Sequence, residues 1–131
     1  MADPPDLRLF GTVFAPGGDD RLCLIYAAVG MGGFDFHSLV WEARVDDTWT
    51  TRLTIAREQF SSAFQHYGWI SEIHSFEPAL GHAIIQVAEG DAAPTAQRAK
   101  ITYSWRLWDL PSNREIAVLK RCENSFDRYV P

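Results

Sequence analysis

The stretch LVWEARVDDTWTTRLTI, residues 39–55, decides the fold of this chain. Apolar and polar residues alternate on both sides of a short turn at residues 46–48. Strict period-two alternation is typical of half-buried antiparallel strands, so the stretch predicts a β-hairpin. The predicted inward pairs are Val45 with Trp49, Ala43 with Thr51, Trp41 with Leu53 and Leu39 with Ile55. The same register places Glu42 opposite Arg52 on the outer side of the hairpin.

The residues before this hairpin predict two further strands. Residues 7–14 form the first, and the turn cluster PGGDD at residues 16–20 follows it. Residues 22–29, LCLIYAAV, are apolar on both faces. Such a run is typical of a central strand, so we expect it to be covered on both sides. Cys23 falls within this run, where a buried, inert thiol is expected.

The period of the pattern changes after the hairpin. In residues 56–67 the apolar positions recur at helical spacing, and Gly68 follows where a helix C-cap belongs. This segment predicts the one helix of the fold, at about residues 56–67. Strand patterns then resume at residues 69–76, 82–89, 99–108 and 114–122.

Residues 99–108 alternate cleanly, and the alternation divides them between two faces. The predicted core face holds Ala99, Ile101, Tyr103, Trp105 and Leu107. The predicted polar face holds Lys100, Thr102, Ser104, Arg106 and Trp108. Pairing Leu107 with Ile116 in the next strand also brings Cys122 onto the core face, opposite Ile101.

Together these elements predict an α+β fold that is predominantly antiparallel β. About seven or eight strands form a curled sheet, a barrel or a sandwich with one helix. A chain of 131 residues is expected to hold a single globular domain, here residues 7–131. A flexible N-terminal tail is expected at residues 1–6.

The composition narrows the class of function. A net charge of −5 and a pI near 5.2 argue against a general binder of the nucleic-acid backbone, because such a protein needs a basic face. The sequence shows no signal-peptide pattern, and no apolar run approaches the ~20 residues that span a bilayer. Two cysteines make no disulfide framework. We therefore expect an acidic, cytoplasmic protein that binds neither nucleic acid nor membrane.

Two histidines mark a candidate binding surface. His74 and His82 lie on the arms of one predicted hairpin, where they are diagonal neighbours on one face. Aromatic, histidine and charged residues mix on this face, and such a composition is typical of protein interfaces. The candidate binding residues are Glu72, His74, Phe76, His82, Ile84 and Trp108.

The histidine spacing also raises the question of a metal site. His66, His74 and His82 recur every eight residues, whereas a divalent ion needs three or four converging ligands. The candidate metal ligands are His37, His74 and His82, although no close-spaced motif such as HExxH is present. The prediction is therefore of no metal, no cofactor and no catalytic residue.

Residues 33–42, GFDFHSLVWE, resemble the first metal motif of cupin barrels. That motif has two histidines at positions i and i+2 and a glutamate four or five residues later. His37 and Glu42 stand at the second histidine and the glutamate, and Asp35 replaces the first histidine. The resemblance implies a metal-dependent cupin-like enzyme. The hairpin register opposes it, because Glu42 points away from the face that carries Trp41.

Three functions remain open on the sequence alone. We expect a small soluble non-catalytic domain that acts through protein–protein contacts, as immunity proteins, inhibitors and accessory subunits do. Its partner is another protein or a second copy of the chain. One alternative is a β-barrel that binds a small apolar ligand, lined by Trp41, Trp49, Leu53, Tyr103 and Trp105. The other is the cupin-like enzyme.

Overall fold

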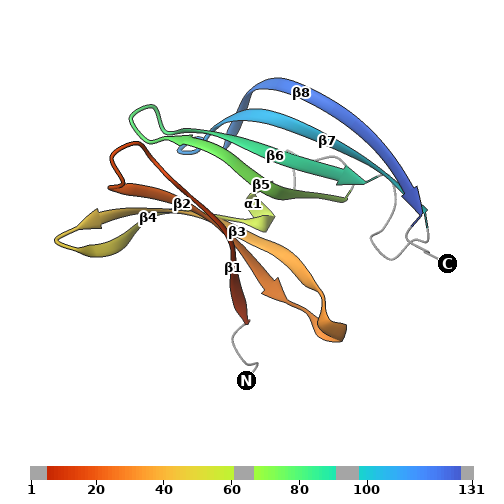
Figure 1. Cartoon of the computed structure of the whole chain (residues 1–131), viewed down its shortest axis with the longest axis horizontal. Coiled ribbons are helices and arrows are strands. Elements are labelled where there is room, and N and C mark those ends of the chain that lie inside the picture. The colour runs from red at the N-terminus through yellow and green to blue at the C-terminus, as the bar shows by residue number, and fades with distance from the viewer. Residues whose placement is uncertain (1–5, 61–66, 91–97, 128–131) are drawn as a thin grey trace.

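Eight strands form two four-stranded antiparallel sheets in the computed structural model, which describes residues 6–60, 67–90 and 98–127 (Figure 1). Sheet A consists of β1 (Leu7–Phe14), β2 (Asp20–Ala28), β3 (Phe34–Val45) and β4 (Thr48–Ala56). Sheet B consists of β5 (Tyr67–Glu77), β6 (His82–Gly90), β7 (Arg98–Asp109) and β8 (Arg114–Asp127). A 3-10 turn, η1 (Gly30–Gly32), joins β2 to β3. The predicted antiparallel fold is confirmed, and the described strands form two separate sheets instead of a closed barrel.

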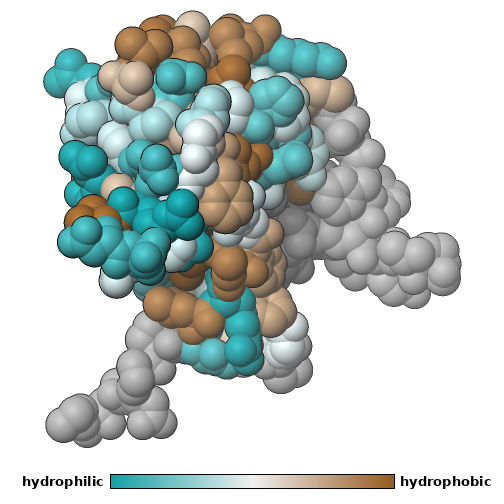
Figure 2. All heavy atoms as spheres, turned by 60° about the vertical axis from the view of Figure 1, so that its left-hand side comes forward, coloured by the Kyte–Doolittle hydropathy of each residue, from teal (hydrophilic) through white to brown (hydrophobic). Residues whose placement is uncertain are grey.

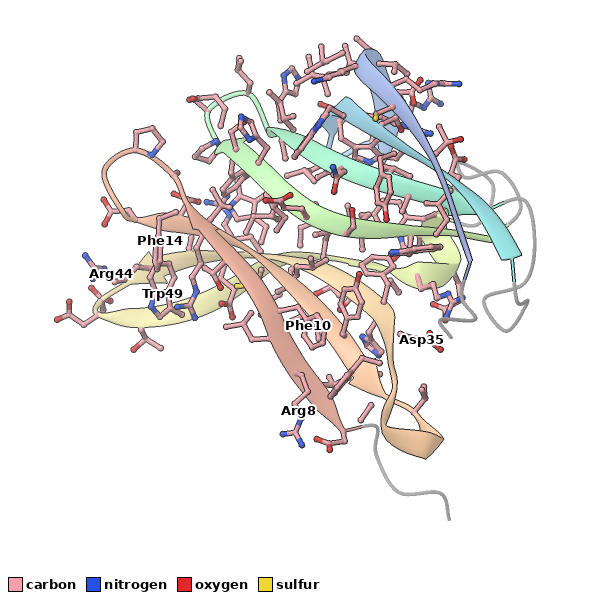
Figure 3. The ribbon with its side chains drawn as sticks, turned by 45° about the vertical axis from the view of Figure 1, so that its right-hand side comes forward. Arg8, Phe10, Phe14, Asp35, Arg44 and Trp49 are labelled. Atoms are coloured by element: carbon pink, nitrogen blue, oxygen red, sulfur yellow. The ribbon has the colours of Figure 1, made fainter. Side chains whose placement is uncertain are left out.

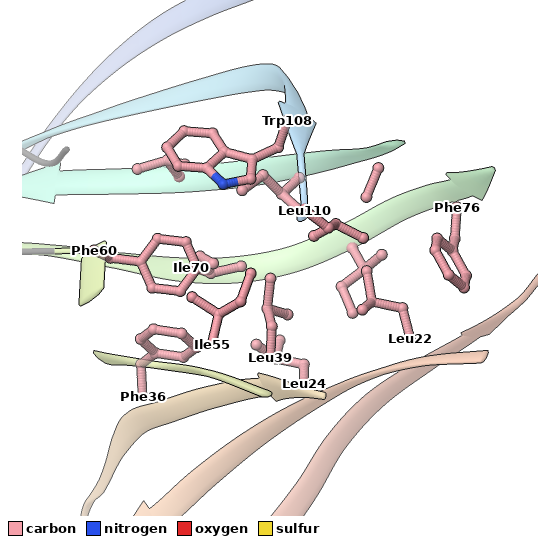
Figure 4. Close-up of a cluster of buried hydrophobic side chains, with 14 of the residues drawn as sticks. Leu22, Leu24, Phe36, Leu39, Ile55, Phe60, Ile70, Phe76, Trp108 and Leu110 are labelled. Atoms are coloured by element: carbon pink, nitrogen blue, oxygen red, sulfur yellow. The ribbon is translucent and has the colours of Figure 1, made fainter. Parts of the chain in front are cut away.

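The inner faces of the two sheets enclose one hydrophobic core (Figure 4). Sheet A contributes side chains such as Leu22, Leu39 and Ile55, and sheet B contributes Ile70 and Trp108. Apolar side chains packed in this way leave water, and that transfer is the main force that holds sheet on sheet.

The predicted helix is shorter than expected within the described residues. The helix α1 (Arg57–Phe60) begins directly after β4, and its Phe60 ring packs on Trp108 at 5.8 Å between ring centroids. Tyr67 and Gly68 already belong to β5, so the predicted end at residue 67 and the C-cap at Gly68 are wrong. Residues 61–66 lie outside the described part. No described helix is long and apolar enough to cross a membrane.

The hairpin of β3 and β4 confirms half of the predicted register. Trp41 pairs with Leu53, and Leu39 pairs with Ile55, as the alternation predicts. The turn, however, has two residues where three are predicted. Asp46 and Asp47 have φ angles of 50° and 63°. Positive φ at both central residues is the geometry of a type I′ turn, whose twist matches that of the flanking strands.

A β-bulge reconciles the two halves of this hairpin. The register shifts by one residue beside Trp41, so Arg52 is the extra residue of β4. Glu42 therefore pairs with Thr51 instead of Arg52, which corrects the predicted cross-strand pair. The Glu42 carboxylate bonds Arg21 of β2, at 2.7 Å from the guanidinium.

From residue 104 to residue 108 the two faces of β7 are the reverse of the prediction, whereas Ile101 is buried as predicted, in a small cluster with Ala88. Arg106 and Trp108 pair with Ile85 and Ala83 of the core, so they point inward. Trp108 is fully buried, whereas Trp105 is only partly buried on the outer face. The reason is a set of polar contacts that lets a charged side chain enter the interior. The Arg106 guanidinium bonds Glu89 at 2.6 Å and Glu115 at 3.1 Å, and its Nε donates to Ser104.

The strand β8 differs from its predicted register as well. Leu107 pairs with Ala117 instead of Ile116, and two bulges interrupt the ladder between β7 and β8. Cys122 pairs with Tyr103 and is exposed, so its predicted place on the core face is wrong.

One hydrogen bond joins the two sheets directly. The Tyr26 hydroxyl of β2 donates to the carbonyl oxygen of Ile70 in β5, at 2.6 Å. Burial, with the Asp35 carboxylate nearby, raises the pKa of Tyr26 from its ordinary value of 10.0 to about 12. The folded state thus holds this proton more tightly than the unfolded chain does.

We expect Tyr26→Phe to remove the inter-sheet bond and lower the free energy of unfolding at neutral pH by about 0.5–1.5 kcal/mol. The stability that the raised pKa gives is complete below pH 10 and is lost as the pH rises through 12. The difference between wild type and variant should therefore shrink above pH 10. Urea unfolding of both proteins from neutral to alkaline pH measures it, and a constant difference would contradict the assignment.

Candidate functional site

The outer face of sheet B carries four of the six residues predicted to bind. Glu72 and His74 of β5 and His82 and Ile84 of β6 lie on this face, opposite the core residues of the same strands. His74 packs edge-on against Trp105, with 5.3 Å between the ring centroids. The histidine-bearing face that the sequence predicts therefore exists as a surface.

The other two predicted residues lie on the opposite side of sheet B. Phe76 packs edge-on against Trp41 at 5.3 Å between ring centroids, inside the core. Trp108 is fully buried, and its indole Nε1 donates to the Asn113 side chain at 2.9 Å. The structure thus separates Phe76 and Trp108 from the face that carries His74.

The candidate metal ligands do not share one place. His37 belongs to sheet A, and its Nδ1 lies 3.0 Å from the Ser38 hydroxyl, whereas His74 and His82 belong to sheet B. Among the described residues, no three histidine, cysteine, aspartate or glutamate side chains converge as a metal ion requires. His66 lies outside the described residues.

His82 has a carboxylate partner in the next strand. Its Nε2 lies 3.3 Å from Oδ1 of Asp109, and Oδ2 of Asp109 accepts bonds from the Ser112 hydroxyl and backbone amide. These bonds from Ser112, helped by His82, lower the pKa of Asp109. A nucleophilic triad needs the imidazole between hydroxyl and carboxylate. Here the carboxylate stands in the middle, which is the wrong order for activating Ser112.

The outer face of sheet A is the feature that the sequence did not predict as a site. Register and alternation place both apolar and polar side chains on this face, away from the core. The apolar ones are Leu7, Leu9, Phe14, Cys23, Ile25, Ala27, Val40 and Trp49, and the polar ones include Thr12, Arg21, Asp35, Glu42, Arg44, Thr51 and Thr54. The apolar side chains concentrate on β1 and β2, where Leu9 is 62% exposed. Figure 2 shows hydrophobic surface beside the grey N-terminal residues, where β1 begins.

Sheet B and α1 both lie on the other side of sheet A (Figure 1). The contacts of β1, β2 and β3 with sheet B are made with β5, across the core. No described element covers the outer face of sheet A. The solvent-facing side of an antiparallel sheet is usually polar, so the exposed apolar residues on the β1 part of this face are unusual.

An aromatic and arginine cluster closes one end of this face (Figure 3). The Trp49 ring packs beside Phe14, with 6.0 Å between the ring centroids. The Arg21 guanidinium lies 4.0 Å from the centre of the Trp49 ring, and that of Arg44 lies at 5.9 Å. Tryptophan and arginine in such arrangements are frequent in the energetic centres of protein interfaces.

Cys23, at the centre of this face, is a buried and unreactive thiol. Cys23 is only 4% exposed, as the sequence predicts. Burial raises the pKa of the Cys23 thiol, and the neighbouring Glu42 carboxylate adds to the rise. A thiol with a raised pKa is a poor nucleophile at neutral pH, so Cys23 serves packing.

The apolar character of β2 was the signal that could have found this face. The run at residues 22–29 predicts a strand covered on both sides, and β2 is indeed a central strand between β1 and β3. The described chain covers only one of its sides. On the second side, Ile25 and Ala27 are partly exposed among the described residues, whereas Cys23 is buried by its neighbours.

The fold defines an antiparallel β-domain of two sheets, and one outer face carries exposed apolar residues that no other described element covers. A comparison with protein-family models found no match, and comparisons with curated proteins and with solved structures found none either.

Proposed function

We propose that this chain is a non-catalytic protein-binding domain, and that the outer face of sheet A is its binding surface. The observation that carries the proposal is the row of exposed apolar side chains on β1, Leu7, Leu9 and Phe14, beside the partly buried Ile25 and Ala27 of β2, on a face that no described element covers. Contiguous exposed apolar surface on a folded protein marks contact sites for other molecules.

The energetics favour a bound partner. Leu7, Leu9 and Phe14 are each about half exposed or more, and removing such a side chain from water is worth about 1.5–3 kcal/mol. The Trp49 and Arg21 pair adds an anchor at the edge of the face. An inhibitor, immunity protein or accessory subunit uses a surface of this kind.

The edge strand β8 also carries exposed apolar residues, but its bulges and basic residues hinder pairing with a strand of another chain. Ile116, Val118 and Leu119 are exposed there. Two bulges interrupt this strand, and Lys120 and Arg121 stand on it. Bulges and basic residues on an edge strand discourage pairing with another chain, which favours the outer face of sheet A as the surface for a partner.

We expect Leu9→Lys to abolish partner binding while leaving the fold intact, because Leu9 is 62% exposed in the free chain. Leu80→Lys is the matched control, because Leu80 is 64% exposed in the turn between β5 and β6. Tagged wild type and both variants would be purified from the cells that naturally produce the protein. A partner in near-stoichiometric amount should be retained by Leu80→Lys and lost with Leu9→Lys.

Thermal melting of the three proteins separates lost binding from lost folding. A partner retained equally by both variants would refute the assignment of this face, and so would the absence of any partner, a second copy of this chain included.

A further inference from the structure

We infer that the occupant of the outer face of sheet A is the same face of a second copy of this chain, related by a two-fold axis. This inference rests on the proposed function and names its partner. The two copies would stack sheet on sheet, so that Leu9 and Ile25 of each copy leave water together.

The shape of the surface fits such a partner. The face is a twisted four-stranded sheet, and the surface that packs best on a twisted sheet is another sheet of the same twist. The inner face of sheet A already packs on a sheet in this way. A second copy supplies the required twist without any change in the fold.

Two oppositely charged side chains of β3 lie at the two ends of the face (Figure 3). Arg44 lies at the end that carries Trp49, and Asp35 lies at the other end, opposite Ala27. Two copies related by a two-fold axis that lies between the two faces and runs perpendicular to the strands bring Arg44 of each over Asp35 of the other. A face-to-face dimer therefore gains two attractive contacts.

The ion pairs that Arg44 and Asp35 make within the chain are weak enough for both side chains to contact a second copy. Arg44 lies 3.6 Å from Asp19, and Asp35 lies 3.9 Å from Arg57, with all four side chains well exposed. Exposed pairs at such distances contribute little, so the side chains can turn to a second copy at small cost. The other charged pair of the face, Arg21 with Glu42, is closed at 2.7 Å and adds no net charge.

The area of the face is sufficient for a reversible dimer. Four strands at ~4.8 Å spacing and about eight residues at ~3.3 Å each give roughly 500 Å² per copy. Two copies together bury roughly 1,000 Å², which is near the lower limit of about 1,000 Å² for a specific interface. The dimer should therefore dissociate on dilution, and sedimentation over a wide range of concentrations should follow it.

The test uses charge reversal at the two ends. Arg44→Asp alone places like charges opposite each other twice in the dimer, and Asp35→Arg alone does the same. Each single variant should weaken the dimer about tenfold at low ionic strength. An equimolar mixture of the two variants should dimerise again, because both cross-contacts are then attractive. Recovery in the mixture is a result that damage to the fold cannot produce.

Leu9→Lys and Leu80→Lys complete the sedimentation experiment. Leu9→Lys should raise the dissociation constant of the dimer about 100-fold, because both copies lose their Leu9 contact. Leu80→Lys should leave the dissociation constant unchanged. A wild-type monomer at all concentrations would overturn the inference, as would charge variants that the mixture does not rescue. If the monomer still binds another protein in a manner that Leu9→Lys abolishes, the proposed function stands and only the second copy is excluded. If Leu9→Lys changes neither dimerisation nor binding to another protein, both proposals are refuted.

Discussion

Trp108→Ala should lower the free energy of unfolding by about 3–5 kcal/mol, the range for truncating a buried aromatic side chain. Trp108 is fully buried at the centre of the core, against the Phe60 ring of α1. Its indole also donates to Asn113, whose side chain bonds the Gln59 carbonyl oxygen. The alanine variant therefore loses packing and releases the polar link between α1 and the turn after β7. Urea unfolding would measure the loss as a lower midpoint with an unchanged slope.

Trp105→Ala is the matched control, because Trp105 stands on the same strand three residues earlier and faces outward. Trp105 is only partly buried, so Trp105→Ala should lower the free energy of unfolding by less than half as much as Trp108→Ala does. Equal losses, or a larger loss at Trp105, would mean that β7 turns its other face to the core.

Arg106→Met should also lower the free energy of unfolding by about 3–5 kcal/mol, but for an electrostatic reason. The Arg106 side chain is 6% exposed and bonds the carboxylate of Glu89, itself only 14% exposed. Methionine fills similar space, but it leaves the Glu89 charge in the interior without the guanidinium. Removing one member of a buried pair is costly because the other charge cannot return to water.

A double variant tests that reason. Arg106→Met combined with Glu89→Gln removes both charges, and it should recover a large part of the stability lost in the single variant. The measurement is again the free energy of unfolding in urea. If the double variant loses more free energy of unfolding than the two single variants lose together, packing and not the broken Arg106–Glu89 ion pair is the cause.

The sequence predicted the β architecture and the inner half of the central hairpin. Alternation pairs Trp41 with Leu53 correctly, because a slip by one residue would turn apolar side chains to solvent. The outer half was missed because aspartate can adopt positive φ, so Asp46 and Asp47 close a shorter turn. Alternation by itself does not reveal the bulge at Arg52 that compensates.

The faces of β7 could not be read from side-chain polarity. Trp105 and Leu107 look like core residues, and Ser104 and Arg106 look exposed. The structure reverses this because Glu89 and Glu115 come from neighbouring strands to neutralise Arg106. Such long-range partners are invisible in a local pattern.

The outer face of sheet A was not predicted for a related reason. His74 and His82 were predicted as binding residues because histidine chemistry is easily recognised in a sequence. The apolar run of β2 was interpreted as a strand covered twice, although the described chain covers it once. A sequence shows that a strand can be buried on both sides, but it does not show which molecule buries it.

The order of the strands has a consequence for how the chain reaches its native state. In both sheets the neighbours in space are also the neighbours in sequence. Each pairing thus closes only a short loop, which costs little entropy and favours rapid formation of hairpins. The late, slow event is then the meeting of the two finished sheets. Until it occurs, sheet A carries apolar side chains on both of its sides, and this is the moment at which the chain is most prone to aggregate.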